Sequence, residues 1–160
     1  MDSKIEFRIF LEFLRNGHKE EASEALRKIL TLAPEKAEPY ALLIGGMLAQ
    51  NGQYREAVSL YEEAIRLNAD DPPAYFYLGA TYHALHEDGE CNRIWDQLAD
   101  RFPNHGLNYY QAALRALKLD QYADAKANLQ KAIERIEPDN PLRNDALKTL
   151  ALIEHKFESH

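Results

Sequence analysis

The sequence has one cysteine, Cys91, and only seven glycines and seven prolines among its 160 residues. A single cysteine cannot form an intramolecular disulfide, so nothing in the sequence requires an oxidising compartment. Glycine and proline do not gather into a linker, and 46% of the residues are hydrophobic. These proportions predict a folded chain with a hydrophobic core, organised as a single domain over residues 1–160.

Basic residues are scarce relative to acidic ones: 19 Lys and Arg stand against 26 Asp and Glu, a formal net charge of −7. An acidic surface repels both nucleic-acid phosphates and anionic lipid headgroups. No stretch approaches the roughly 20 apolar residues of a membrane span, and the segment 1–6 is charged where a signal peptide would be apolar. We therefore expect neither nucleic acid nor membrane as a partner, and a cytoplasmic location.

Motifs that carry chemistry are missing as well. The sequence contains no phosphate-binding glycine loop, nucleophile elbow or dinucleotide fingerprint. His83 and His86 lie three residues apart with Cys91 nearby, but a zinc site needs about four ligands and there is no second cysteine. We interpret His83 as a polar group that lines a groove and Cys91 as a small core residue. The sequence thus predicts no enzyme, no metal site and no cofactor.

What the sequence does contain is an internal repeat of 34 residues. Similar residues recur at this spacing, and an upstream unit joins the pattern after one inserted residue. Four units follow, at approximately residues 3–36, 38–71, 72–105 and 106–139. Three columns show the repeat most clearly: Gly45, Gly79 and Ala113; Ala57, Cys91 and Ala125; and Tyr61, Trp95 and Leu129.

Each unit is predicted to be a pair of antiparallel helices. Small residues such as Gly45 and Gly79 would let the two helix axes approach closely, and apolar residues at i, i+3 and i+4 would form a buried stripe. Ser3 and Glu6 have the spacing of a capping box at a helix start. A further helix at approximately 141–157 is predicted to cap the last apolar face. The expected fold class is an all-α solenoid of helical hairpins.

Turns between the paired helices are predicted where glycine occurs, at Gly17, at Asn51-Gly52 and at Gly89. The third unit has the segment 86–90 at this place, with the sequence His-Glu-Asp-Gly-Glu. Because this segment differs from the turn Gly52-Gln53-Tyr54 of the second unit, we expect a locally irregular turn there.

The repeat resembles the tetratricopeptide repeat (TPR) family, and the resemblance covers nearly the whole chain. The second unit is the clearest match, with Ile44-Gly45, the turn Gly52-Gln53-Tyr54, and then Ala57, Tyr61 and Ala64. The resemblance implies a right-handed solenoid of four repeats plus a C-terminal capping helix, acting as a protein-binding adaptor or chaperone. Size, acidic charge and repeat number are also similar to the chaperones of type III secretion translocator proteins.

In this family the first helix of each unit lines a concave groove in which ligands lie. Some family members bind the free C-terminal carboxylate of their ligand with a cluster of basic residues on these first helices. Such a cluster is missing at the equivalent positions here, because the two basic residues, Arg15 and Lys118, stand at opposite ends of the groove. The resemblance therefore implies an apolar, partly aromatic groove, which includes Phe76 and Tyr110, for an apolar peptide or helix of a client protein. The residues predicted to line it are Phe7, Leu11, Leu14, Leu42, Gly46, Ala49, Gln50, Phe76, Ala80, His83, Tyr110, Leu114, Leu117 and Lys118.

Two other arrangements account for the same apolar surface. The chain could be a homo-oligomeric scaffold, with a homodimer as its simplest form, in which the groove is filled by a second copy. Alternatively, the N-terminal or C-terminal helix could fold back and fill the groove within one chain. The sequence leaves these alternatives open.

Overall fold

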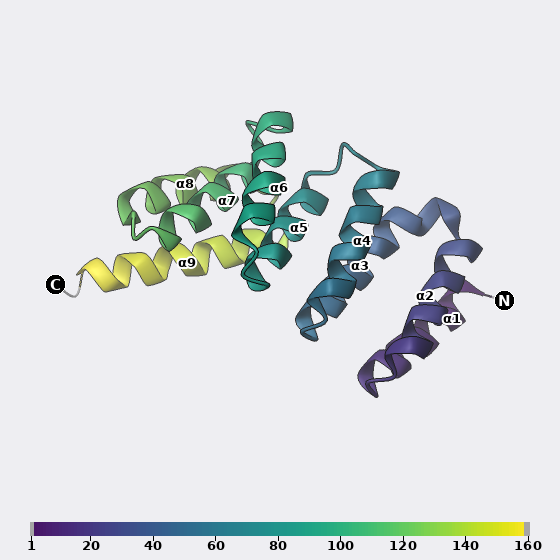
Figure 1. Ribbon diagram of the computed structural model, residues 1–160. Coiled ribbons are helices and arrows are strands. Elements are labelled where there is room, and N and C mark those ends of the chain that lie inside the picture. The colour runs from purple at the N-terminus through teal and green to yellow at the C-terminus, as the bar shows by residue number, and fades with distance from the viewer. Residues whose placement is uncertain (1, 159–160) are drawn as a thin grey trace. The chain divides into compact units, whose positions relative to one another are not determined.

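The computed structural model describes the backbone of residues 2–158 and the side chains of residues 2–157. This part of the chain contains helices and turns but no strand, which confirms the all-α prediction. The helices in order are α1 (Ser3–Arg15), α2 (Lys19–Leu32), the short 3₁₀ helix η1 (Pro34–Lys36), α3 (Ala37–Gln50), α4 (Tyr54–Leu67), α5 (Pro72–Ala84), α6 (Asp88–Arg101), α7 (Gly106–Lys118), α8 (Tyr122–Arg135) and α9 (Pro141–Glu158) (Figure 1).

The helices form two compact units, residues 1–70 and residues 71–160. The N-terminal unit holds α1 to α4, and the C-terminal unit holds α5 to α9. The boundary falls between the second and third predicted repeats, so each unit contains two helix pairs. The single-domain organisation stays a prediction.

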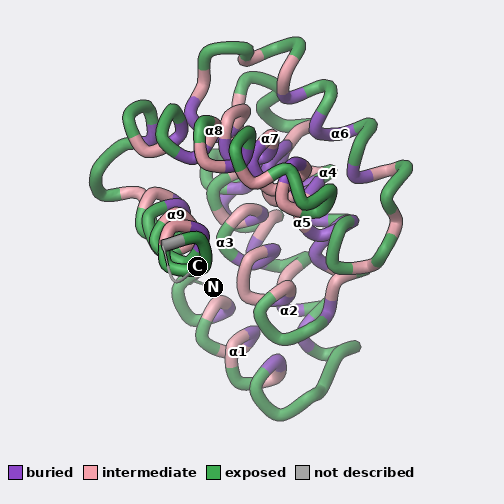
Figure 2. Tube along the Cα trace, turned by 90° about the vertical axis from the view of Figure 1, so that its left-hand side faces the viewer, coloured by how far each residue is buried: buried purple, intermediate pink, exposed green. Residues whose placement is uncertain are grey.

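Within each unit, every helix makes its most extensive contacts with the other helix of its own pair, α1 with α2, α3 with α4, α5 with α6 and α7 with α8 (Figure 1). Buried residues recur along one side of these helices and alternate with exposed ones (Figure 2). This is the pattern that an amphipathic helix gives when one stripe faces a neighbour. The helix pairs begin at residues 3, 37, 72 and 106, next to the predicted starts of the four repeats.

The glycine at each crossing lies directly against an aromatic ring of the paired helix. A Cβ atom added to Gly45 would come within 2.9 Å of Cε1 of Tyr61, and one added to Gly79 would overlap the indole of Trp95. At this short range the Trp95 Nε1–H donates a hydrogen bond to the Phe76 carbonyl oxygen at 3.2 Å. The repeated glycine is therefore needed because the ring packs onto the helix backbone itself.

The four turns inside the helix pairs share one geometry. Gly17, Gly52, His86 and Asp120 occupy equivalent places and all have a positive φ, between 56° and 77°. After each of them, a backbone N–H donates back into the preceding helix, as Glu87 does to the Tyr82 carbonyl at 3.0 Å. The expected irregular turn in the third unit is therefore wrong, because His86 adopts the left-handed conformation that glycine adopts in the first two turns.

Two other sequence predictions need correction at helix starts. Gly89 is not a turn residue but lies in the first turn of α6. The cap of α1 is Asp2 rather than Ser3, since the Asp2 carboxylate accepts a hydrogen bond from the Lys4 N–H at 3.1 Å. Ser3 is already helical, and three residues after Asp2 stands Ile5, so the predicted capping box of Ser3 and Glu6 is not formed.

Helix α9 covers the end of the C-terminal unit, as predicted for the capping helix. It packs against α8, where Ala146 and Ile153 are buried. The Arg143 Nε–H donates to the Ile133 carbonyl at 2.9 Å, and Lys126 forms an ion pair with Glu154 at 3.0 Å. These contacts join the last helix to the last repeat by apolar and polar contacts together.

Replacing the crossing glycine with alanine tests the role of close packing. We expect Gly79→Ala to lower the free energy of unfolding by about 1–3 kcal/mol, the usual cost of overpacking a core, because the added methyl group overlaps Trp95. Urea denaturation followed by circular dichroism measures it. Gly89→Ala is the matched control, since nothing lies within 4 Å of an added Cβ there. Equal losses in the two variants would contradict the packing argument.

The turn geometry makes a second prediction, of opposite sign. His86→Gly should raise the free energy of unfolding by about 1 kcal/mol, because a non-glycine residue pays roughly 1–2 kcal/mol in the left-handed region. Gly52→Ala, at the equivalent turn position, should lower it by a similar amount. Thermal melts of the two variants check both signs, and a destabilised His86→Gly chain would rule out strain at this turn.

Candidate functional site

In the N-terminal unit, the predicted groove residues lie on α1 and α3 with mixed exposure. The ring of Phe7 is half-buried and stacks on Tyr40 at a centroid distance of 6.0 Å. Leu14 is buried. Leu14 is therefore withdrawn from the predicted groove, while its neighbours on these two helices keep part of their surface accessible. Leu11, Leu42, Gly46 and Ala49 are half-buried, and Gln50 is exposed.

In the C-terminal unit, two of the predicted groove residues are not accessible. Phe76 is 3% exposed and Tyr110 is 6% exposed, and their rings stack on each other at 5.2 Å. Burial raises the pKa of the Tyr110 phenol, and the nearby hydroxyl of Thr149 on α9 opposes part of that rise. The prediction that both rings face an open groove is wrong, because the C-terminal helix covers this side of α7.

The other predicted residues of this unit keep some exposure. Ala80, Leu114 and Leu117 are half-buried, while His83 and Lys118 are exposed. Three of these five, His83, Leu114 and Lys118, line a cavity of about 320 Å³, which we call the Trp95 cavity. Helix α6 and the end of α7 complete its wall with Asp88, Cys91, Asn92, Trp95, Arg115 and Leu119.

Trp95 is held rigidly in the wall of this cavity. The imidazole of His83 stacks on the indole at 6.3 Å, and the Arg115 guanidinium lies 5.7 Å from the centre of the same ring. The Phe76 ring stacks on it at 6.1 Å. Trp95 is only 2% exposed and its indole N–H is already bonded to the Phe76 carbonyl, so it forms a buried apolar wall behind the residues that line the cavity opening.

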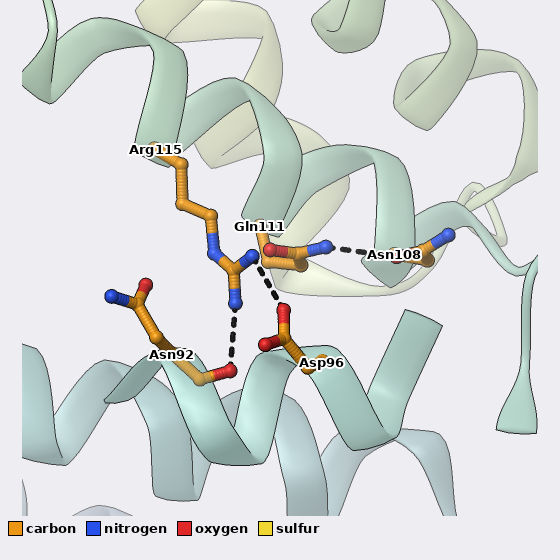
Figure 3. A network of polar contacts seen from close by, with 5 residues as sticks. All are labelled: Asn92, Asp96, Asn108, Gln111 and Arg115. Atoms are coloured by element: carbon orange, nitrogen blue, oxygen red, sulfur yellow. Dashed lines mark hydrogen bonds and ion pairs between the residues drawn. The ribbon is translucent and has the colours of Figure 1, made fainter. Parts of the chain in front are cut away.

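Polar contacts fix the arginine beside this ring (Figure 3). Arg115 Nη1 donates to Asp96 Oδ1 at 2.9 Å, and Nη2 donates to the Asn92 carbonyl at 3.0 Å. One turn earlier on α7, Gln111 donates to Asn108 at 2.8 Å (Figure 3). The two bonds of Arg115 connect α7 to α6 and hold the two walls of the Trp95 cavity together, whereas the Gln111 bond lies within α7.

The charges at the rim of the cavity are paired with each other. Lys118 forms an ion pair with Asp88, and its hydrogen bond lowers the pKa of the Asp88 carboxyl. Arg115 is paired with Asp96. Burial raises the pKa of the Cys91 thiol, so the cysteine contributes an apolar, protonated wall. The cavity can therefore accept an apolar group more readily than a free anion.

Sequence reasoning missed the contribution of the second helix. It drew the groove only from the first helix of each unit, whereas Asp88, Asn92 and Trp95 come from α6. The available signal was the column of Tyr61 and Trp95, because a large ring opposite a glycine must reach across to the first helix. Among residues 2–157, no group of three or more His, Cys, Asp or Glu side chains could hold a metal ion. None of the helices described here is long and apolar enough to cross a membrane.

Comparison with known families finds two repeat models in this chain. One described as "Tetratricopeptide repeat" matches residues 11–36, and one described as "TPR repeat" matches residues 45–85. They cover the last part of α1 with α2 and η1, and the region from the middle of α3 to the end of α5. A comparison with curated proteins found no match.

Several solved structures share the fold. The crystal structure of MamA protein covers 98% of this chain and 92% of its own, with a TM-score of 0.59 and 19% identity. The Yersinia enterocolitica type III secretion translocator chaperone SycD, in an alternative dimer, covers 78% and 96%, with a TM-score of 0.57 and 21% identity. The first TPR of Spaghetti (RPAP3), bound to the HSP90 peptide SRMEEVD, covers 77% and 94%, with a TM-score of 0.54 and 16% identity. The repeat models show that this chain contains tetratricopeptide repeat sequence at residues 11–36 and 45–85, and the solved structures show that it shares the fold of tetratricopeptide repeat proteins.

Proposed function

We propose that this chain is a protein-interaction module that binds an apolar peptide or helix of a client protein, as an adaptor or a secretion-type chaperone in the cytoplasm. The single observation that carries the proposal is the Trp95 cavity, which has an apolar wall, paired rim charges and three of the predicted groove residues. Two proteins of similar fold support it, since one is a translocator chaperone and the other is bound to a peptide.

The size of the cavity fits one side chain of a client better than a whole ligand. Its volume of about 320 Å³ lies at the lower end of the roughly 300–1,000 Å³ of small-molecule sites. Burying one Leu or Phe side chain contributes about 1.5–3 kcal/mol, whereas micromolar binding requires about 8 kcal/mol. The client must therefore use further apolar contacts beyond this cavity.

The burial of Phe76 and Tyr110 makes them unsuitable positions for a substitution that tests client binding. A charged substitution at Phe76 or Tyr110 would disrupt the core of the C-terminal unit, because both rings are enclosed. Leu114 is the better position, since it is half-buried and lines the cavity directly. Leu152, which is 71% exposed on α9 and lies outside the cavity, is the matched control.

We expect peptides selected by this chain from a random phage-displayed library to share a large apolar residue. Their binding should change the fluorescence of Trp95, the single tryptophan of the sequence, because that ring forms the cavity wall. Leu114→Glu should weaken binding at least about tenfold, a loss of 1.4 kcal/mol or more, while Leu152→Glu leaves it unchanged. Circular dichroism verifies that both variants keep their helicity.

Two results would count against this function. If Leu114→Glu and Leu152→Glu bind the selected peptides equally well, the cavity is not the client site. If the chain selects no peptide and its mass by light scattering rises with concentration, a homo-oligomeric scaffold replaces the client-binding module. Loss of that rise in Leu114→Glu would then place the self-contact at the cavity.

A further inference from the structure

A second hollow lies in the N-terminal unit, on the face of the first hairpin that no described element covers. Its volume is about 640 Å³. Glu6, Ile9 and Phe13 from α1 line one side, and residues of α2 line the other. We call this surface the outer groove. It shares no residue with the Trp95 cavity.

The repeat pattern indicates what shape the outer groove fits. Residues 35 positions later in the sequence are Ala41, Ile44 and Leu48, and all three are buried in the N-terminal unit, where α3 packs against both α2 and α4. In the first hairpin the same positions hold Glu6, Ile9 and Phe13, and the two apolar side chains are only half-buried. The surface is therefore built like one that a helix of a neighbouring repeat covers.

The charge of the groove indicates the chemistry of that helix. Glu20, Glu21 and Glu24 of α2 add three carboxylates to that of Glu6, against one cation, Lys28. Glu21 and Glu24 have only exposed, long contacts of 3.6 Å, with His18 and Arg27. Such exposed pairs contribute little, so the carboxylates remain able to attract a cationic partner.

The position of Glu6 distinguishes this groove from the polar outer face of an ordinary terminal repeat. A terminal repeat needs a polar outer face for solubility, and exposed acids suffice for that. Glu6, in contrast, is only 3% exposed, lines the groove, and its carboxylate has no hydrogen bond or ion pair with any of residues 2–157. Because its oxygens are not sealed away from solvent, the carboxylate faces the groove, where a Lys or Arg of a partner would pair with it.

We propose that the outer groove docks a basic amphipathic helix of a partner protein. The apolar stripe of that helix covers Ile9 and Phe13, one Lys or Arg within the stripe pairs with Glu6, and cations on its flanks face Glu20 and Glu24. This contact does not depend on the client site, because it uses other residues of the other unit.

The test uses the full chain and a synthetic amphipathic peptide of roughly 18 residues, about five helical turns, with a leucine stripe flanked by Lys and Arg. A control peptide carries Glu in place of every Lys and Arg. We expect calorimetry to show binding of the basic peptide alone, with an affinity that falls as salt rises. Shifts in the amide NMR spectrum should map to α1 and α2.

Matched variants then separate docking from general attraction to an acidic protein. Glu6→Gln should weaken the basic peptide about tenfold or more, the usual effect of losing a charged hydrogen bond, and Phe13→Ala should weaken it as well. Glu137→Gln makes the same charge change on an exposed residue of the C-terminal unit, and Phe157→Ala removes an exposed ring of α9. Neither control should change the affinity. Glu20→Gln, on the exposed rim, provides a second test if Glu6→Gln lowers helicity.

Three results would overturn the proposal. Equal losses of affinity in Glu6→Gln and Glu137→Gln would show that the peptide is attracted only by the net charge of the chain. Absence of binding by the basic peptide would leave the groove as a polar cap. Sedimentation of the unliganded chain as a dimer, reversed by Phe13→Glu, would assign the groove to a second copy of the chain instead.

Discussion

The close approach of one glycine and one aromatic ring in a helix pair is the contact on which the candidate site depends. Without a Cβ atom on Gly79, the indole of Trp95 reaches the backbone of α5 and bonds to the Phe76 carbonyl. This packing holds the indole in place as one wall of the Trp95 cavity, and the side chains of His83 and Arg115, which lie against the ring, complete that wall. The same packing constraint that joins two helices thus also shapes a cavity beside them.

The C-terminal helix decides which apolar residues remain available. By covering Tyr110, and with it the stacked Phe76 ring, α9 turns part of the predicted groove into core. What stays accessible in that unit is the Trp95 cavity, bounded by α6 and α7. The accessible apolar surface of the C-terminal unit that the proposed client would use is therefore a cavity between helices, where the sequence alone predicted a broad apolar surface.

The two candidate surfaces differ in electrostatics and would select different partners. Cations and acids at the rim of the Trp95 cavity neutralise each other, Lys118 with Asp88 and Arg115 with Asp96. Binding there must come mainly from apolar burial, with little dependence on salt. Glu6 in the outer groove has no such partner among the described residues, so charge contributes to recognition on that surface. One chain of net charge −7 can in this way carry two distinct contacts.

The sequence by itself determined the helix pairs, their boundaries and the capping helix, because a 34-residue period with small residues at fixed places permits little else. The regular third turn could also have been predicted from the sequence, by aligning His86 with Gly52 instead of relying on the nearby Gly89. Only the tertiary structure decided the exposure of the site residues. Phe76 and Phe7 occupy one column, yet the first is buried and the second half-buried. Burial depends on which neighbouring elements cover a position. The periodicity of the repeats does not indicate which residues of the other helices α9 covers.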